Sequence, residues 1–242
     1  MTLKTVLFDF NGIIINDESI HQELINDILL SENLRPSSND YQEVCVGRSD
    51  RACLQDIFSR RGRILKEDYL AKLIKVKSQA YCQKISSLET LPLYSGLAAV
   101  MDKIKALGWK LGLVTGAVRA DVDLILDQAG LADYFSVIVA GDDITASKPD
   151  PQGYLLAVDY LNRQEPQLQL KPDNCLVIED TPAGIQAAKN AGMQVVGVAN
   201  TYPLHMLQRQ ANWTVDYLEE LEWERIEKVF SGEEYQLAVS EC

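Results

Sequence analysis

The chain has 242 residues, enough to bury one core and a small appended domain, and its composition of 47% hydrophobic and 24% charged residues is typical of globular proteins. Its formal net charge of -12 would repel polyphosphate backbones, so we predict no nucleic-acid partner, although a small anionic substrate remains compatible. No segment approaches about eighteen continuous apolar residues and no cleavable apolar leader is visible, so we expect no membrane span and no export signal.

Short apolar runs that end at polar or glycine residues recur along the chain. Runs of this kind suit strands that are buried on both faces of a parallel sheet. They occupy residues 5–8, 110–114, 137–140, 176–178 and 195–198. Helical patterns alternate with them at residues 96–107, 119–128, 153–161 and 183–190. From about residue 91 onward, this alternation predicts a doubly wound α/β domain.

The first predicted strand is followed by a purely helical stretch instead of the second strand. Ile20, Leu24, Ile25, Ile28 and Leu29 fall on one helical face, and similar patterns follow further along. We therefore predict an all-α cap domain at residues 16–90, inserted into a core formed by residues 1–15 and 91–242. Because ligands of parallel sheets bind beyond the carboxyl ends of the strands, an insert leaving the first strand would cover the site as a lid.

Five cysteines, namely Cys45, Cys53, Cys82, Cys175 and Cys242, include no C-x-x-C pair, and the chain has only two histidines. This pattern argues against a zinc site and predicts buried or incidental thiols in a reducing cytoplasm. We also expect the protein to be a monomer.

The residues that follow the predicted strands combine carboxylates with one amide, one hydroxyl and one ammonium group. They are Asp9, Asn11, Thr115, Lys148, Glu179 and Asp180. Converging oxygen ligands suit Mg²⁺, which also prefers phosphate oxygens. A lysine would offset the charge of a phosphoryl group, and a threonine at a helix start would donate a hydrogen bond to it. No glycine-rich nucleotide-binding motif is present, so we predict no nucleotide cofactor.

Four segments, VLFDFNG, LVTGA, SKPDP and VIEDTPAGIQAA, occur in this order, within a resemblance that covers the chain up to about residue 220. Together they resemble the motifs of the haloacid dehalogenase superfamily, and the chain is most similar to its β-phosphoglucomutase and phosphoglycolate-phosphatase-like subgroup. The resemblance implies a Rossmann-like parallel-sheet core with an inserted helical cap. It further implies a Mg²⁺-dependent phosphatase that acts on a small phosphorylated metabolite.

The resemblance also assigns roles to individual residues. Asp9 would attack phosphorus and form an aspartyl phosphate, which Lys148 would stabilise. Thr115, with the backbone of Gly116 and Ala117, would hold the phosphoryl oxygens. The Mg²⁺ ligands would be Asp9, the backbone carbonyl of Asn11, Asp180 and Glu179, the last of these directly or through water. The acidic pair at 179–180 argues against a metal-independent dehalogenase.

The family usually has an acid–base aspartate where this chain has Asn11. A carboxamide has no titratable proton near neutral pH, and loss of a positioned acid–base group typically costs ~10²–10⁴ in rate. The protein is then either a slow phosphatase for good leaving groups, an enzyme that takes its proton from His21 or Glu18, or a phosphometabolite-binding protein without turnover. Deamidation at Asn11-Gly12 could supply traces of activity, and an engineered exchange is a further alternative. Asn16 replaces a second family aspartate, which favours natural divergence.

The cap segment VGRSDR, residues 46–51, resembles the substrate-facing loop of the subgroup. Mutase-like members carry an arginine where this chain has Asp50, so we favour hydrolysis over a phosphosugar mutase activity. His21, Gly47, Arg48 and Arg51 are the predicted substrate contacts in the cap, the two arginines because guanidinium groups suit planar oxyanions. The alternative is that both arginines are solvated residues at a helix start.

Overall fold

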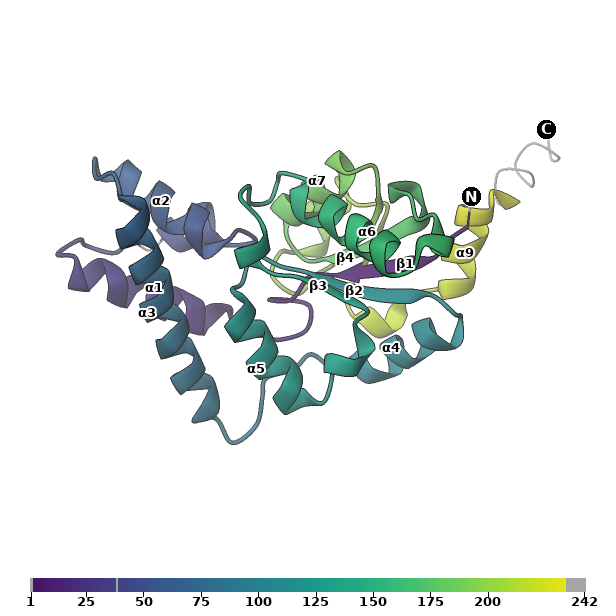
Figure 1. Ribbon diagram of the computed structural model, residues 1–242, viewed down its shortest axis with the longest axis horizontal. Helices are drawn as coiled ribbons and strands as arrows, with labels where there is room; N and C mark the ends of the chain where they lie inside the picture. Colours follow the sequence, from purple (N-terminus) through teal and green to yellow (C-terminus); the bar gives the residue numbers. More distant parts are fainter. Residues whose placement is uncertain (1, 38, 234–242) are drawn as a thin grey trace.

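The computed structural model describes residues 2–37 and 39–233, and it centres on a sheet of six strands that are all parallel to their neighbours (Figure 1). The strands are β1 (Thr5–Phe8), β2 (Lys110–Val114), β3 (Val137–Val139), β4 (Cys175–Glu179), β5 (Gln194–Val198) and β6 (Trp213–Val215), in the order β3-β2-β1-β4-β5-β6. The five predicted strands are confirmed to within one residue at each end, whereas β6 was not predicted.

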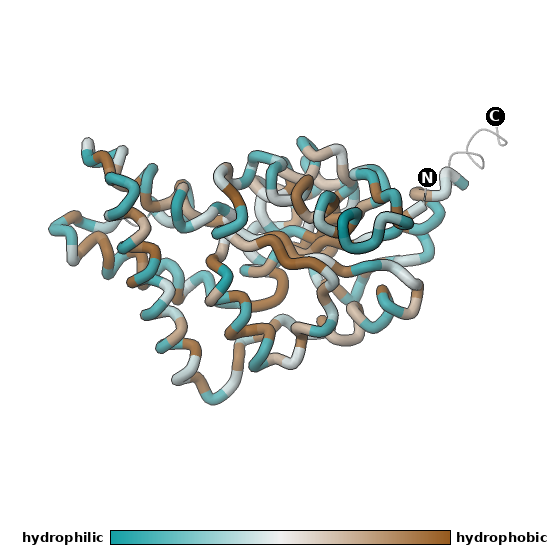
Figure 2. The backbone as a smooth tube through the Cα atoms, viewed as in Figure 1, coloured by the Kyte–Doolittle hydropathy of each residue, from teal (hydrophilic) through white to brown (hydrophobic). Residues whose placement is uncertain are grey.

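Helices cover both faces of this sheet because successive strand side chains point to opposite faces and both sets are apolar. In β1, Val6 and Phe8 belong to one hydrophobic cluster and Leu7 belongs to the other. Figure 2 shows the strands as a hydrophobic band between helices with mixed surfaces. The first face packs against α4 (Leu97–Ala106), α5 (Arg119–Ala129) and α9 (Trp223–Ser231); the second packs against α6 (Gln152–Gln164), α7 (Pro182–Asn190) and α8 (Leu204–Leu207).

A helical insert follows β1 and lies beyond one end of the sheet (Figure 1). It contains α1 (Glu18–Ser31), a π-helix (Tyr41–Cys45), α2 (Asp50–Arg60) and α3 (Glu67–Ser86). The insert has its own hydrophobic cluster, which includes Leu29, Phe58 and Leu70. The predicted architecture of a Rossmann-like core with an all-α cap is confirmed, while the domain limits at residues 15/16 and 90/91 remain predictions. Residues 234–242 of the predicted core lie outside the described part of the chain.

The loop after β1 places its own backbone against a carboxylate that follows β4, the neighbour of β1 in the sheet. Gly12 has a φ of 81°, and a Cβ added there would collide with the carboxylate of Asp180. Glycine is therefore required at this position for two reasons, its left-handed backbone and the close approach. Asn200 anchors the turn, because its Nδ2 donates a hydrogen bond to the carbonyl oxygen of Gly12 at 2.6 Å.

The cysteine prediction is wrong for one pair. Cys45 and Cys53 form a disulfide within the cap, whereas Cys82 and Cys175 are free thiols. Cys242 lies outside the described residues. Eight positions separate the bonded cysteines, and the π-helix between α1 and α2 brings their Cα atoms to 4.6 Å. Within the described residues, no helix is both long and apolar enough to cross a membrane.

Candidate active site

A buried lysine links two carboxylates at the carboxyl end of the sheet. Lys148 Nζ lies 2.7 Å from Asp9 Oδ1 and 2.6 Å from Glu179 Oε1, and it also donates to the carbonyl oxygen of Val114. Burial would lower the pKa of Lys148, but the two carboxylates raise it above its usual value. Burial and the charge of Glu179 raise the pKa of Asp9, and Lys148 offsets part of this increase. Lys148 is thus the cation that offsets the charges of both carboxylates in this buried site.

Asp180 differs from its neighbour Glu179 in having unused oxygens. Neither side-chain oxygen of Asp180 has a hydrogen-bond partner among the described residues, although the side chain is fully buried. Burial, together with the charges of Glu179 and Asp9, raises its pKa well above the ordinary value, and the side chain of Thr201 offsets only part of this rise. An unpaired buried carboxylate is costly unless a cation neutralises it. Asp9, Glu179 and Asp180 offer oxygens within 4.8 Å of one another, so these residues fit a hard divalent cation such as Mg²⁺.

The two oxygens of Glu179 are already occupied by protein donors. Oε1 accepts hydrogen bonds from Lys148 and from the Tyr154 hydroxyl at 2.9 Å. Oε2 accepts from the backbone of Asp180 and from the backbone and hydroxyl of Thr181. Of the two acids that end this strand, Asp180 is therefore better placed as a direct ligand, and Glu179 is better placed to orient Lys148.

The loop after β2 forms a second wall of the site. Thr115 is buried, and its Oγ1 accepts a hydrogen bond from the backbone N–H of Ala117 at 3.0 Å. Gly116 packs against the cap, because a Cβ added there would lie 2.8 Å from Cα of Ser49. The structure therefore brings the predicted phosphate-binding loop next to the cap segment that was predicted to face the substrate.

A cavity lies between the cap and the sheet and gathers most of the predicted site residues. Its lining includes Asp9, Asn11, Thr115, Gly116, Ala117 and Lys148 from the core and Glu18, His21, Gly47 and Arg48 from the cap. Arg48 also pairs with Asp56 at 2.7 Å. Arg51 does not line this cavity, because it forms an ion pair with Glu67 on α3. Glu179 and Asp180 are buried and do not line this cavity.

The side chain of Asn11 turns toward a buried carboxylate that the sequence analysis did not single out. Asn11 Nδ2 lies 3.0 Å from both side-chain oxygens of Asp17 and 3.0 Å from Nε2 of His21. The Tyr81 hydroxyl donates to Asp17 Oδ2 at 2.5 Å. Burial raises the pKa of Asp17, but the charge and hydrogen bond of His21 and the bonds from Tyr81 and Asn11 bring it below its usual value. Asp17 is thus an ionised acceptor for three donors.

Lys77 determines which nitrogen of His21 carries the proton. Lys77 Nζ lies 2.7 Å from Nδ1 of His21 and 2.7 Å from Oδ1 of Asp50. An ammonium group only donates, so Nδ1 of a neutral imidazole accepts and the proton is assigned to Nε2, which donates to Asp17 Oδ2 at 3.2 Å. With this tautomer, the Asn11 amide nitrogen 3.0 Å from Nε2 donates to Asp17 and not to the ring. Both ring nitrogens are therefore occupied. The ring also stacks on Tyr81 with centroids 4.7 Å apart.

Glu18 has fewer partners than His21 and lines the same cavity. The Tyr41 hydroxyl donates to its Oε2 at 2.6 Å. Burial raises the pKa of Glu18, and this hydrogen bond offsets part of the rise. A carboxyl group with a raised pKa can act as a proton donor nearer neutral pH than an ordinary one. Of the two acid–base alternatives, the geometry favours Glu18.

Sequence reasoning missed Asp17, Lys77 and Tyr81, which complete the network around Asn11. Asp17 precedes α1 and has the residue type of an N-cap, yet its side chain makes no capping hydrogen bond. Lys77 reads as a solvated lysine on an amphipathic helix, although only 1% of its surface is exposed.

Comparison with known proteins adds family membership to this geometry. Residues 6–198 match the family described as haloacid dehalogenase-like hydrolase. The chain is 30% identical over 220 residues to protein CbbY of Rhodobacter capsulatus, covering 89% of this chain and 93% of that protein. It is 29% identical over 229 residues to β-phosphoglucomutase of Bacillus subtilis, covering 92% of this chain and 96% of the relative.

Solved structures agree on the fold. A β-phosphoglucomutase from Clostridium difficile superimposes with a TM-score of 0.82 at 23% identity, covering 97% of this chain and 99% of that one. A CbbY variant from Rhodobacter sphaeroides, solved in complex with xylulose-(1,5)bisphosphate, has a TM-score of 0.76 at 23% identity, covering 91% and 96% of the two chains. Both comparisons support the sheet-and-cap architecture described above.

Proposed function

The chain belongs to the haloacid dehalogenase-like hydrolases, and we propose that it is a Mg²⁺-dependent phosphatase for a small phosphorylated metabolite. The observation that carries this proposal is the cluster of Asp9, Lys148 and Asp180. Asp9 is hydrogen-bonded to Lys148, and the neighbouring Asp180 has two oxygens without a hydrogen-bond partner among the described residues. Phosphoryl transfer depends mainly on positioning and on charge stabilisation, and this cluster provides both.

In the proposed reaction, an Asp9 carboxylate oxygen attacks phosphorus while the bond from phosphorus to the leaving oxygen breaks. Lys148 holds the charge of the resulting aspartyl phosphate, and Thr115 with the backbone of residues 116–117 donates hydrogen bonds to the phosphoryl oxygens. Asp9, Asp180 and the backbone carbonyl of Asn11 would hold Mg²⁺, with Glu179 beside them, and the ion would supply charge neutralisation when bound. Hydrolysis of the aspartyl phosphate then restores Asp9.

Asn11 cannot move the proton that these steps require, so another group must do so. We assign this role to Glu18, which is protonated when the leaving oxygen departs and ionised when it deprotonates the attacking water. Its position in the cavity wall and its raised pKa support the assignment. His21 is less suitable because Lys77 and Asp17 already engage both of its ring nitrogens.

Phosphorylated carbohydrates are the first substrates to test, because relatives named for this chemistry cover almost the whole chain. A phosphatase of validoxylamine A 7'-phosphate from Streptomyces hygroscopicus subsp. limoneus is 27% identical over 229 residues. Hydrolysis is preferred over mutase chemistry for this chain. Asp50 lines the cavity and pairs with Lys77, so an acceptor stands where mutase-like members carry an arginine that would donate to a second phosphate.

A second candidate function is binding of a phosphometabolite without turnover. It is supported by the closed network in which the Asn11 amide donates to Asp17, because this network holds no spare proton at the usual acid–base position. In that case the cavity would serve recognition alone. A monomer acting in the cytoplasm remains a prediction for either function.

Phosphate release with and without Mg²⁺ separates these candidates. The enzyme should hydrolyse acetyl phosphate and p-nitrophenyl phosphate faster than hexose phosphates, since better leaving groups need less protonation. Asp9→Asn should abolish release from every substrate. Peptide mapping should show intact Asn11 in the active sample, which excludes a deamidated fraction as the source. If hexose phosphates raise the melting temperature but none is hydrolysed, the binding function is the correct one.

A further inference from the structure

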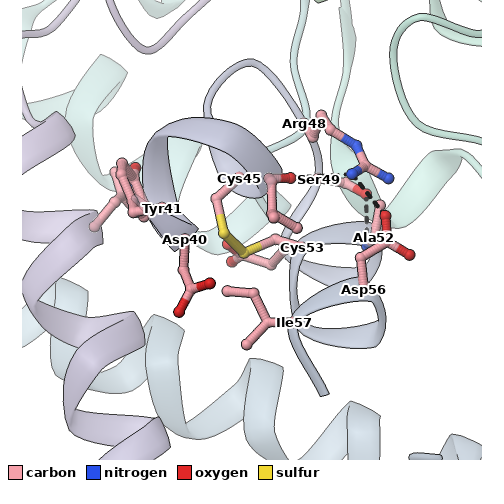
Figure 3. Close-up of a disulfide and its surroundings, with 12 residues drawn as sticks. Asp40, Tyr41, Cys45, Arg48, Ser49, Ala52, Cys53, Asp56 and Ile57 are labelled. Atoms are coloured by element: carbon pink, nitrogen blue, oxygen red, sulfur yellow. Dashed lines mark hydrogen bonds and ion pairs between the residues drawn. A yellow bond between two sulfur atoms is a disulfide. The ribbon is translucent and has the colours of Figure 1, made fainter. Parts of the chain in front are cut away.

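The disulfide of the cap lies in the wall of the active-site cavity. Cys45 ends the π-helix and Cys53 lies in the first turns of α2, where Figure 3 shows their sulfur atoms joined between the two elements. Both side chains are largely buried, with 6% and 2% of their surfaces exposed, yet both residues line the cavity that contains Asp9. A ligand in this cavity would therefore approach the disulfide.

The segment closed by this disulfide is the cap loop that touches the core. We call residues 46–52, which include the first turn of α2, the bridging loop. Its Ser49 accepts a hydrogen bond from Ala52 N at 3.3 Å and so begins α2, while Ser49 N donates to Ser147 Oγ at 2.7 Å. The neighbour of Ser147 in sequence is Lys148. One short loop thus joins the start of a cap helix to the segment that carries the lysine of the active site.

Glycine packing shows how closely the bridging loop fits the core. A Cβ added to Gly47 would lie 2.6 Å from Thr181 Oγ1, and one added to Gly116 would lie 2.8 Å from Ser49 Cα. Contacts this tight fix the backbone of the loop for as long as the cap rests against the core. The loop must keep its conformation for the cap to rest against Gly116 in the phosphate-binding loop and against Thr181 beyond the end of β4.

We propose that Cys45 and Cys53 form a thiol–disulfide modification site that fixes or releases the bridging loop. Oxidation closes a ring around the loop, which removes alternative loop conformations and favours the arrangement seen in the structure. Reduction opens the ring and leaves Gly47 and Ser49 held only by their contacts with the core. The effect on substrate binding rests on the proposed function, whereas the effect on the loop does not.

The exchange is balanced with a low-molecular-weight disulfide such as oxidised glutathione as the oxidant. One cysteine thiolate attacks the small disulfide and expels a thiolate, and the second cysteine thiolate then attacks the mixed disulfide and expels another. The protein loses two protons and two electrons, which the small disulfide takes up as two thiols. Reduction by a dithiol follows the same steps in reverse. In a reducing compartment such a disulfide is transient, as expected for a modification site and not for a structural bond.

The test uses the full chain equilibrated in glutathione buffers of different composition. Alkylation followed by mass spectrometry should show that Cys45 and Cys53 are protected together in oxidising buffer and labelled together in reducing buffer. Hydrogen exchange of the bridging-loop amides should be faster in the reduced protein, with unchanged exchange in the sheet. We expect the KM of a hydrolysed phosphate ester to rise roughly two- to tenfold on reduction, the equivalent of one side chain that must be immobilised on binding.

Two variants make the test decisive. Cys45→Ser/Cys53→Ser should match the reduced protein in both buffers, and Cys82→Ser, which removes a free thiol on α3, should respond to the buffers like wild type. If the double variant fails to fold, chemically reduced wild type supplies the same comparison. The proposal is overturned if the pair can be reduced only after unfolding, or if reduction changes neither loop exchange nor KM. A protein without phosphatase activity would still show the exchange difference, so failure of the proposed function is a separate result.

Discussion

The core side and the cap side of the cavity organise their charges in different ways. On the core side, Asp180 keeps two buried oxygens without hydrogen-bond partners, next to the paired Asp9 and Lys148. On the cap side, Asp17 is buried as well but accepts hydrogen bonds from three side chains. Since an unsatisfied buried carboxylate is costly, the core side is built to receive a cation, and the cap network is already complete. The core side thus fits the phosphoryl-transfer part of the proposed reaction, whereas on the cap side the carboxylate of Asp17 is already engaged by hydrogen bonds.

Asp180→Asn would test the core side and should have the largest effect. An amide keeps the shape of the side chain but removes the negative charge of this residue from the ligand set, so Mg²⁺ affinity and turnover should both fall by roughly 10²-fold or more. Calorimetric titration with Mg²⁺ measures the first and phosphate release at saturating Mg²⁺ measures the second. The matched control is Asp216→Asn, an exposed aspartate outside the cavity. Equal Mg²⁺ binding in both variants would contradict the account of the core side.

Glu18→Gln would test which cap residue moves the proton. Loss of a positioned acid–base group should lower kcat by about 10²-fold or more on hexose phosphates and by much less on acetyl phosphate. His21→Gln is the control, because Lys77 and Asp17 already engage its ring nitrogens, and it should mainly reduce stability. Wild-type turnover of hexose phosphates should also fall as the pH rises through the raised pKa of Glu18, since the protonated acid is lost. If His21→Gln has the larger effect on kcat, the assignment is wrong.

The paired exchange Asn11→Asp/Asp17→Asn would return an acid to the core side of the network. Asn11→Asp alone would place two carboxylates about 3 Å apart, where they repel and share one proton. We therefore expect the double variant to hydrolyse hexose phosphates roughly tenfold faster than wild type and the single variant to gain less. Wild type, Asn11→Asp, Asp17→Asn and the double variant form a double-mutant cycle, in which kcat is measured for each protein. Purely additive effects would show that Asn11 and Asp17 do not act as a pair.

Asp121→Asn addresses the contact between the cap and the core away from the cavity. Asp121 on α5 accepts a hydrogen bond from Ser78 on α3, its other oxygen has no partner, and burial raises its pKa to about 6. The protonated form is favoured in the folded state, so stability from this group is present below the unfolded pKa and is lost as the pH rises through about 6. The variant should gain on the order of 2 kcal/mol over wild type at neutral pH but little at about pH 4.5. Urea unfolding with a metal chelator measures both values, and a pH-independent difference would contradict this explanation.

The core could be predicted from the sequence more fully than the cap network. Apolar runs that end at Asp9, Thr115 and Glu179 mark both the strands and the residues beyond them, because position at a strand end fixes position in the sheet. Strand β6 has only three residues, all partly buried, so it gives no apolar run of its own. Apolar patterns in the sequence do not show which side chains pair inside a helical domain. For that reason Asp17 and Lys77 and the bond between Cys45 and Cys53 could not be predicted.

Trapping of the phosphorylated enzyme tests the central claim most directly. The full chain would be mixed with labelled acetyl phosphate and Mg²⁺, quenched with acid within milliseconds, digested and sequenced by mass spectrometry. Asp9 is the aspartate that forms an ion pair with Lys148 in the cluster, so we predict that the phosphoryl group is found on this residue and on no other. Asp9→Asn should remain unlabelled. Label on another residue, or phosphate release by Asp9→Asn at the wild-type rate, would contradict the account.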